Sequence, residues 1–267
     1  MALNWIRKRV LITVRTYPVP AQKGVEVSCT AAVTPEAEWI RLFPVPYRRM
    51  PPDKKFRKYQ WVDLDLQKAK NDARPESYHL KIDSIKLGKV VEADDQEWAA
   101  RREILRPLMR PSLCTIQKER DENGHPTLGL FRSGQIKRLI IEAAEPDWSA
   151  GQQAILKQQS LFDDENIPKE DLEKIPFDFR YDFVCDDTKC TGHNLSCTDW
   201  EMGQSYRAWR KQYGGAWEAK FRERYERDMI EKNDTHFYVG TVHQYPKSWI
   251  IVGLFYPPKR EMADLFA

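Results

Sequence analysis

The sequence has no long apolar run, and its start is not expected to be a secretion signal. None of its 267 residues lies in an apolar run approaching the roughly 18 residues that a transmembrane helix needs. The start, residues 1–14, has a basic patch followed by an apolar stretch that is too short for a signal-peptide core and better suited to a first strand. We therefore expect a cytoplasmic protein with no membrane partner.

Common catalytic signatures are missing too. The sequence has no P-loop, no glycine-rich dinucleotide fingerprint and no Gly-x-Ser-x-Gly motif. It also lacks the His-x-Glu and Pro-Cys-x2-Cys pair that zinc deaminases require. These absences argue against several large enzyme classes and leave open whether the protein is an enzyme.

The composition is that of a folded protein with an uneven charge. Hydrophobic residues make up 41% and aromatic residues 12% of the chain. The net charge is only +3, yet residues 1–60 carry twelve Lys or Arg against four Asp or Glu, and residues 151–200 carry five against eleven. A basic N-terminal quarter favours a polyanion partner, most often nucleic acid, although a solvated basic surface gives the same count.

The N-terminal third is predicted to be mostly β. Five short runs rich in β-branched and aromatic residues lie at 9–15, 25–33, 38–45, 59–66 and 79–91. Short strands joined by basic, proline-containing connections are typical of a small barrel, OB-like or PUA-like in outline. We therefore predict a β-rich basic module over residues 1–92.

The rest of the chain mixes helices and strands, which indicates the α+β class. Helical patterns occur at 97–110, 149–160, 199–213 and 216–232, and strand patterns at 136–145, 175–185, 236–243 and 248–258. The Asn123-Gly124 turn signal predicts a hairpin between 114–120 and 127–133. The acidic segment 160–176 is our candidate boundary, so we divide the remainder into a mixed region, 93–160, and a C-terminal α+β region, 161–267.

A compact cluster of metal-binding residue types lies in the C-terminal half. Three of the five cysteines and one histidine fall within thirteen residues: Cys185, Cys190, His193 and Cys197. In a reducing compartment such a cluster favours metal over disulfides, and three thiolates with one imidazole can close a tetrahedron around Zn²⁺. The cluster resembles a zinc knuckle in ligand type and compactness. That family uses Cys-x2-Cys-x4-His-x4-Cys, so the resemblance is partial. It gives no reason of its own to expect nucleic-acid binding.

Two other interpretations of the cluster stay open. Asp199 can take the place of Cys197 as the fourth ligand, with Cys197 packed in the core. The thiols can also be buried small hydrophobic groups that hold no metal. A site closed by four protein ligands has no open position for water, so we expect a structural zinc-binding loop and no chemistry at the metal.

Acidic residues after the cluster allow an enzymatic alternative. Asp199 and Glu201 stand at a predicted helix start, where acidic side chains favour the positive end of the helix dipole. Together with Glu218 and Lys220 they also resemble the residue set of Mg²⁺-dependent phosphodiesterases. In that set the Glu-x-Lys pair normally lies on a strand, whereas here it lies in a predicted helix.

The segment 41–61 combines cations with aromatic residues. Cations contact phosphates and aromatic rings can stack on bases, although a charged surface loop with inward-packed rings has the same composition. The candidate nucleic-acid contacts are Arg41, Arg48, Arg49, Lys54, Lys55, Arg57, Lys58, Tyr59 and Trp61.

These observations favour a nucleic-acid-binding protein with a structural zinc site. The alternatives are a nuclease that uses Asp199, Glu201, Glu218 and Lys220, for which Mg²⁺ would be the cofactor, and a component of a protein assembly. The sequence does not distinguish DNA from RNA.

Overall fold

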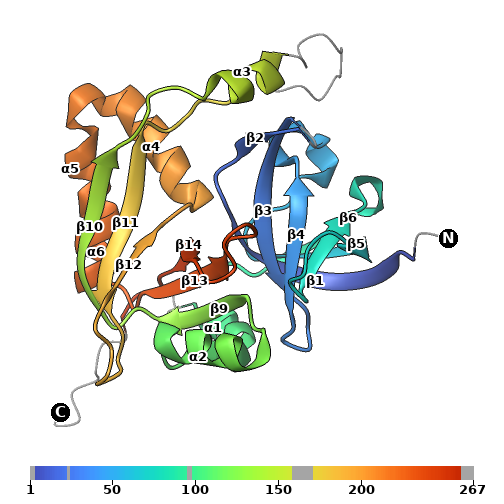
Figure 1. Ribbon diagram of the computed structural model, residues 1–267, viewed down its shortest axis with the longest axis horizontal. Coiled ribbons are helices and arrows are strands. Elements are labelled where there is room, and N and C mark those ends of the chain that lie inside the picture. Colours follow the sequence, from blue (N-terminus) through green and yellow to red (C-terminus); the bar gives the residue numbers. More distant parts are fainter. Residues whose placement is uncertain (1–3, 23–24, 95–97, 158–170, 260–267) are drawn as a thin grey trace.

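The computed structural model describes residues 4–22, 25–94, 98–157 and 171–259. It is a mixed α+β structure in which a closed barrel of N-terminal strands stands beside two further sheets and the C-terminal helices (Figure 1). The predicted α+β class and the N-terminal barrel are therefore confirmed. Its OB-like or PUA-like identity stays a prediction.

Five strands close the barrel because β1 pairs with two neighbours. It runs antiparallel to both β3 and β5, and β4 and β6 complete the ring. Along β5 buried and half-buried residues alternate, so one face of the strand fills the barrel. The strands are β1 (Ile6–Arg15), β3 (Val25–Val33), β4 (Trp39–Val45), β5 (Gln60–Lys68) and β6 (Ser77–Leu80), with β2 (Val19–Ala21) added to β3 and β7 (Lys86–Val90) added to β5.

Two sheets follow the barrel along the chain. One has the order β14-β13-β9-β8 and the other β10-β11-β12. Their strands are β8 (Met109–Arg110), β9 (Leu128–Arg132), β10 (Gln135–Ala143), β11 (Phe177–Val184), β12 (His193–Ser196), β13 (His236–Thr241) and β14 (Trp249–Phe255). Leu11 and Val14 of the barrel share a core with Leu128 and Val252 of the four-stranded sheet, so the barrel and this sheet are packed together.

Helices complete the C-terminal part. They are α1 (Ala99–Leu105), α2 (Leu113–Asn123), α3 (Ala150–Lys157), α4 (Trp200–Tyr213), α5 (Trp217–Arg222) and α6 (Asp228–Glu231), with a π-helical turn at Glu223–Arg227 between the last two. The four-residue repeat Trp217, Phe221, Tyr225 and Met229 is buried in one core with β11, as expected of a core stripe. No helix in the described ranges is long and apolar enough to span a membrane.

The predicted hairpin at 114–120 is wrong. Residues 113–123 form α2, whose N-terminus is capped by the Ser112 hydroxyl accepting the N–H of Thr115. Gly124, with φ of 73°, is the left-handed residue that ends this helix. Asn-Gly therefore marks a helix C-terminus here, because a left-handed glycine suits both a tight turn and a helix end. The predicted strand at 79–91 is two strands, β6 and β7, which a 3₁₀ turn at Ile82–Ser84 separates. The other predicted helices and strands are present within the described residues, with bounds that differ by a few residues. The candidate boundary at 160–176 lies largely outside the described residues.

Candidate functional site

Four side chains converge on a potential metal site. The sulfurs of Cys114, Cys185 and Cys190 and an imidazole nitrogen of His193 all lie within 4.8 Å of one another. The Cys114 Sγ and His193 Nε2 atoms are 3.3 Å apart. Ligand atoms around a tetrahedral zinc lie about 3.3–3.8 Å apart, because each Zn–ligand bond is about 2.0–2.3 Å. The donor set and its spacing therefore fit one tetrahedral ion.

Three elements bring these ligands together. Cys114 lies in the first turn of α2, Cys185 directly follows β11, and His193 begins β12, where it pairs with Phe183. Between them the chain turns tightly, with the Cys190 N–H donating to the Asp187 carbonyl at 3.0 Å. The cluster thus ties a helix terminus to both ends of the β11–β12 connection.

Gly134 gives the ligand loop room. Its φ is 64°, and a Cβ at this position would lie 2.2 Å from the Val184 carbonyl oxygen. The close approach of these backbones holds the residues around Cys185 against the turn that joins β9 to β10, so only glycine fits at position 134.

Burial and hydrogen bonding act differently on the individual ligands. Burial raises the pKa of Cys114 to about 12 and also raises the pKa of Cys185. Although burial acts in the same sense at Cys190, the N–H groups of Cys185 and Gly192 lower the pKa of its thiol. Burial lowers the pKa of His193, which favours the neutral imidazole that binds metals.

Cys197 does not belong to the cluster. It lies beyond β12, and the four residues of that strand carry it about 13 Å from His193. Its buried sulfur contacts the Met202 sulfur at 3.3 Å, and burial raises the pKa of its thiol far above the ordinary value. The fourth position that the sequence assigned to Cys197, or alternatively to Asp199, is occupied by Cys114.

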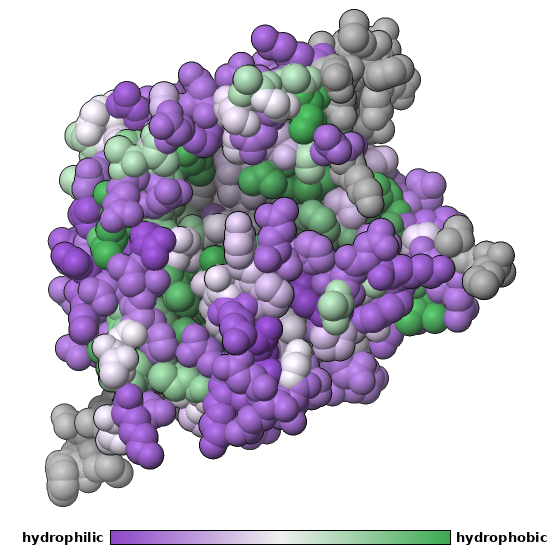
Figure 2. Space-filling model, viewed as in Figure 1, coloured by the Kyte–Doolittle hydropathy of each residue, from purple (hydrophilic) through white to green (hydrophobic). Residues whose placement is uncertain are grey.

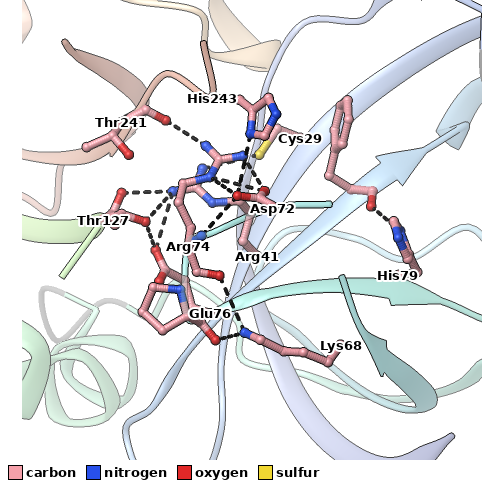
Figure 3. Close-up of polar contacts among 12 residues, drawn as sticks. Cys29, Arg41, Lys68, Asp72, Arg74, Glu76, His79, Thr127, Thr241 and His243 are labelled. Carbon is pink, nitrogen blue, oxygen red and sulfur yellow. Dashed lines mark hydrogen bonds and ion pairs between the residues drawn. The ribbon is translucent and has the colours of Figure 1, made fainter. Parts of the chain in front are cut away.

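Two of the candidate nucleic-acid contacts lie in the interior. Arg41 is 2% exposed and donates from Nη2 to the Thr127 carbonyl at 2.8 Å, with the Glu76 carboxylate 3.5 Å away (Figure 3). Tyr59 is 3% exposed, and its hydroxyl is 3.5 Å from that of Tyr238. A nucleic-acid strand cannot reach either side chain, so neither residue belongs to a contact surface.

The remaining cations and the tryptophan are spread over the barrel surface and its junction with α4. Arg48 pairs with Glu26 at 3.1 Å, and the Lys54 ammonium donates to the Ile85 carbonyl. Trp61 lies half-buried beneath the Arg9 guanidinium, while Arg49 and Lys55 are half-buried. Arg57 is exposed, and its guanidinium makes no hydrogen bond or ion pair within the described parts of the chain.

A cavity of about 540 Å³ opens where the barrel meets α4. The face in Figure 2 shows hydrophobic side chains gathered in the hollow between the two parts of the molecule and a mainly hydrophilic exterior. Aromatic rings and cations from both parts line the cavity, among them Arg15, Tyr47, Arg57, Trp200, Trp209 and Tyr256. Cavities of this size bind small molecules or parts of larger ones.

Lys58 and Glu201 form an ion pair in the wall of this cavity. The Lys58 Nζ is 2.7 Å from Glu201 Oε2 and 3.0 Å from the Leu254 carbonyl. Although burial acts to lower it, the charges of Glu201 and Asp199 raise the pKa of Lys58. Burial likewise opposes the effect of Lys58 on Glu201, whose pKa is lowered. Both groups are therefore charged near neutral pH.

Asp199 caps α4, as expected of an acidic residue at a helix start. Its Oδ1 accepts the Glu201 N–H at 2.6 Å, and its Oδ2 accepts the Leu254 N–H at 2.9 Å. Burial raises the pKa of Asp199 to about 6 against the opposing charge of Lys58, and Glu201 adds to the rise. Both Asp199 oxygens therefore accept hydrogen bonds from backbone N–H groups. Glu201 is the carboxylate that faces the cavity.

Comparisons with known families cover nearly the whole chain. The family model described as Domain of unknown function (DUF8757) matches residues 109–267, and a second, described as Domain of unknown function (DUF8758), matches residues 6–107. The chain belongs to the DUF8757 family. No curated protein matches the sequence.

The DUF8757 region contains all four ligands of the cluster, whereas the cavity draws on both matched regions. Glu218 and Lys220 lie in this region but outside the cavity lining, where Glu218 pairs with Arg222 at 2.8 Å and Lys220 with Glu223 at 2.7 Å. Of the four residues in the nuclease set, Asp199 and Glu201 thus lie together at the cavity, whereas Glu218 and Lys220 do not line it.

Sequence reasoning missed Cys114 and the lining residue Arg15. Cys114 is 79 residues from His193, and the only signal was a cysteine following a helix-capping serine. Arg15 ends the first strand, where a lone arginine has no distinguishing pattern.

Proposed function

We propose that the protein binds nucleic acid through the cavity between the barrel and α4. The observation that carries the proposal is the combination of aromatic rings and cations on one concave surface. Arg15, Arg57, Lys58 and Arg224 face this space against the two carboxylates of Asp199 and Glu201, which leaves an excess of positive charge. A phosphodiester strand supplies both the anions and the flat rings that such a surface favours.

Arg57 supports this choice of partner. It comes from the basic segment 41–61, it is exposed, and within the described residues its guanidinium has no protein partner. An unpaired guanidinium at the rim of a cavity is well placed to contact a phosphate, because its planar donors match phosphate oxygens.

The test is fluorescence anisotropy with labelled single-stranded DNA and RNA over a series of salt concentrations. We expect the affinity to fall with rising salt, because bound phosphates release counterions. Arg57→Ala should weaken binding several-fold and flatten the salt dependence by about one counterion. The matched control is Arg106→Ala, which removes an exposed arginine whose described partner is Glu103 and which does not line the cavity.

Absent or salt-independent binding would contradict the proposal. Adding Mg²⁺ to the same mixtures tests the nuclease alternative, for which Asp199 and Glu201 still lie together. Cleavage that Glu201→Gln abolishes would favour that alternative, and intact strands would remove it.

We also propose that the cluster of Cys114, Cys185, Cys190 and His193 holds a structural Zn²⁺. Thiolate and imidazole are the ligands that zinc prefers, and a bound ion would supply a cross-link between α2 and the β11–β12 connection. With four protein ligands no position is open for water, so this ion would stabilise the fold and do no chemistry.

Metal content of the purified protein, measured by mass spectrometry, tests this proposal. We expect about one zinc per chain, which Cys114→Ser should lose. Cys29→Ser is a matched control, because Cys29 lies in the barrel, outside the cluster. Cys197→Ala should keep the zinc. Loss of zinc from Cys197→Ala with retention in Cys114→Ser would contradict the ligand set.

A further inference from the structure

We infer that the cavity takes a single nucleotide unit with its base turned inward, and that Glu201 accepts a hydrogen bond from the amino group of that base. This inference rests on the proposed nucleic-acid binding and specifies its chemistry. The cavity selects a base whose Watson–Crick edge carries an exocyclic amino group beside a ring-nitrogen acceptor, namely cytosine or adenine, over uracil or thymine.

Aromatic rings form part of the cavity wall. The Arg15 guanidinium carbon lies 3.3 Å from the centroid of the Tyr47 ring and 4.3 Å from that of Trp200, so this cation contacts two aromatic rings that are inclined to each other by 72°. Its Nε is buried and has no hydrogen-bond partner among the described residues. The Arg15 guanidinium therefore holds the two rings in place in the cavity wall.

Trp209 supplies a second ring surface. It is half-buried on α4 and lines the cavity, and it contacts Phe221 edge-on at 6.1 Å and Tyr225 in a tilted arrangement at 6.1 Å. Part of the indole thus stays accessible from the cavity. Stacking on such a ring is worth about one to two orders of magnitude in affinity per base.

Glu201 and Lys58 present an acceptor beside a donor. Glu201 Oε2 receives the Lys58 ammonium, whereas Oε1 accepts no hydrogen bond from any residue in the described ranges. The Glu201 side chain is 41% exposed, so the free oxygen can be reached. The ammonium donates to Glu201 and Leu254, which leaves its third proton available.

This pair complements one edge of cytosine and of adenine. In both bases an amino donor stands beside a ring-nitrogen acceptor, which match the carboxylate and the ammonium respectively. Uracil and thymine carry a carbonyl oxygen where cytosine carries the amino group. That oxygen would face the Glu201 carboxylate without a proton between them, so two acceptors would repel each other.

Two cations remain to receive the phosphate. Arg57 has no partner within the described chain, and Arg224 lies over the Tyr256 ring at 4.8 Å with only a long contact of 3.8 Å to Asp228. Both line the cavity. A nucleotide with its base beside Glu201 would therefore have a choice of guanidinium groups for its phosphate.

The experiment measures the affinity of the full chain for strands that differ at one central position. We expect cytosine or adenine at that position to bind about tenfold more tightly than uracil. Glu201→Gln should abolish this difference, because an amide can donate as well as accept. Trp209→Ala should weaken all strands about tenfold, and Trp209→Phe should restore most of the affinity. Glu218→Gln, a surface carboxylate outside the cavity, is the control.

Competition with cytidine and uridine 5′-monophosphates distinguishes a strand from a free nucleotide. Strand binding with no base preference overturns this inference and leaves the proposed function intact. Binding of cytidine monophosphate without strand binding supports the inference and overturns the proposed function. Failure to bind either overturns both.

Discussion

Asp72 holds Arg74 in place between the barrel and the four-stranded sheet. Arg74 Nε lies 2.8 Å from Asp72 Oδ1, and Nη2 lies 2.6 Å from Oδ2. The same guanidinium donates from Nη1 to the Thr241 carbonyl at 2.8 Å (Figure 3). Although burial acts to raise it, the hydrogen bonds from Arg74 lower the pKa of Asp72 below its ordinary value of 3.8.

This shift predicts a pH dependence of stability. An aspartate with a lowered pKa in the folded state stabilises the fold above 3.8, and that contribution is lost as the pH falls, because the unfolded chain takes up the proton first. From about pH 5 to about pH 3, we expect the free energy of unfolding to fall less in the Asp72→Asn variant than in the wild type. Urea denaturation at both pH values measures the difference.

The exposed Asp83 offers a control for this measurement. The variant Asp83→Asn should keep the wild-type dependence. An identical loss of stability in the wild type and Asp72→Asn would show that the contact with Arg74 does not persist in solution.

Single residues also show how much of the metal site could be predicted. Cys185, Cys190 and His193 were predicted from their spacing, because a short turn leaves little choice of geometry. Cys197 was excluded by an extended strand whose presence the spacing does not reveal. Cys114 depends on tertiary packing of α2 against β12, and local spacing carries no information about such a contact.

At the scale of elements, the start of α2 supports the metal site. The Ser112 hydroxyl accepts the Thr115 N–H at 3.0 Å, and Cys114 lies between these two residues. Ser112→Ala removes this cap, which should lower the free energy of unfolding by about 1 kcal/mol. It should also weaken zinc retention against a chelator, because the first turn that holds Cys114 becomes less ordered.

Ser149→Ala is the matched comparison for this element. Ser149 accepts the Gln152 N–H at the start of α3, a helix that carries none of the four ligands. Its loss should leave zinc retention unchanged. Equal zinc retention in both variants would contradict the coupling between the α2 cap and the cluster.

Elements with a clear period were predictable, and one with an ambiguous turn signal was not. The apolar stripe of residues 217–229 and the alternation along β5 follow from burial of one face. Residues 114–123 have weak helical amphipathicity, so the turn signal at Asn123-Gly124 predicts a hairpin in place of the helix. Only the cap at Ser112 and the left-handed Gly124 distinguish the helix from a hairpin there.

At the scale of the whole molecule, a buried polar network joins the two matched regions. Arg41 on β4 contacts Glu76 and Thr127, and the Thr127 hydroxyl donates to the Glu76 carboxylate (Figure 3). Arg41→Met would leave the Glu76 carboxylate buried without its cation. We expect a loss of about 3–5 kcal/mol in the free energy of unfolding, measured by denaturant titration.

Two further variants sharpen this measurement. Adding Glu76→Gln to Arg41→Met should recover part of the loss, because the unpaired charge is removed. Arg106→Met breaks an ion pair whose side chains are 74% and 69% exposed, so its effect should stay within about 0.5 kcal/mol. A loss in Arg41→Met no larger than in Arg106→Met would mean that the network does not stabilise the fold.

The sequence indicated the barrel strands, but it did not indicate how the barrel packs against the four-stranded sheet. Arg41 looked like a surface cation because charge runs are usually solvated, and nothing local pairs it with Glu76 and Thr127. Closure of the barrel through β1 and β5 likewise joins residues 50 to 60 positions apart, which periodicity does not encode.

The ion pair in the cavity wall predicts how the two matched regions evolve. Lys58 lies in the part matched by DUF8758, and its partner Glu201 lies in the part matched by DUF8757. A gene that kept one part and lost the other would encode half of the cavity and one charge of the ion pair without its partner. We therefore expect evolution to duplicate, transfer and fuse the two parts together, with positions 58 and 201 changing in concert.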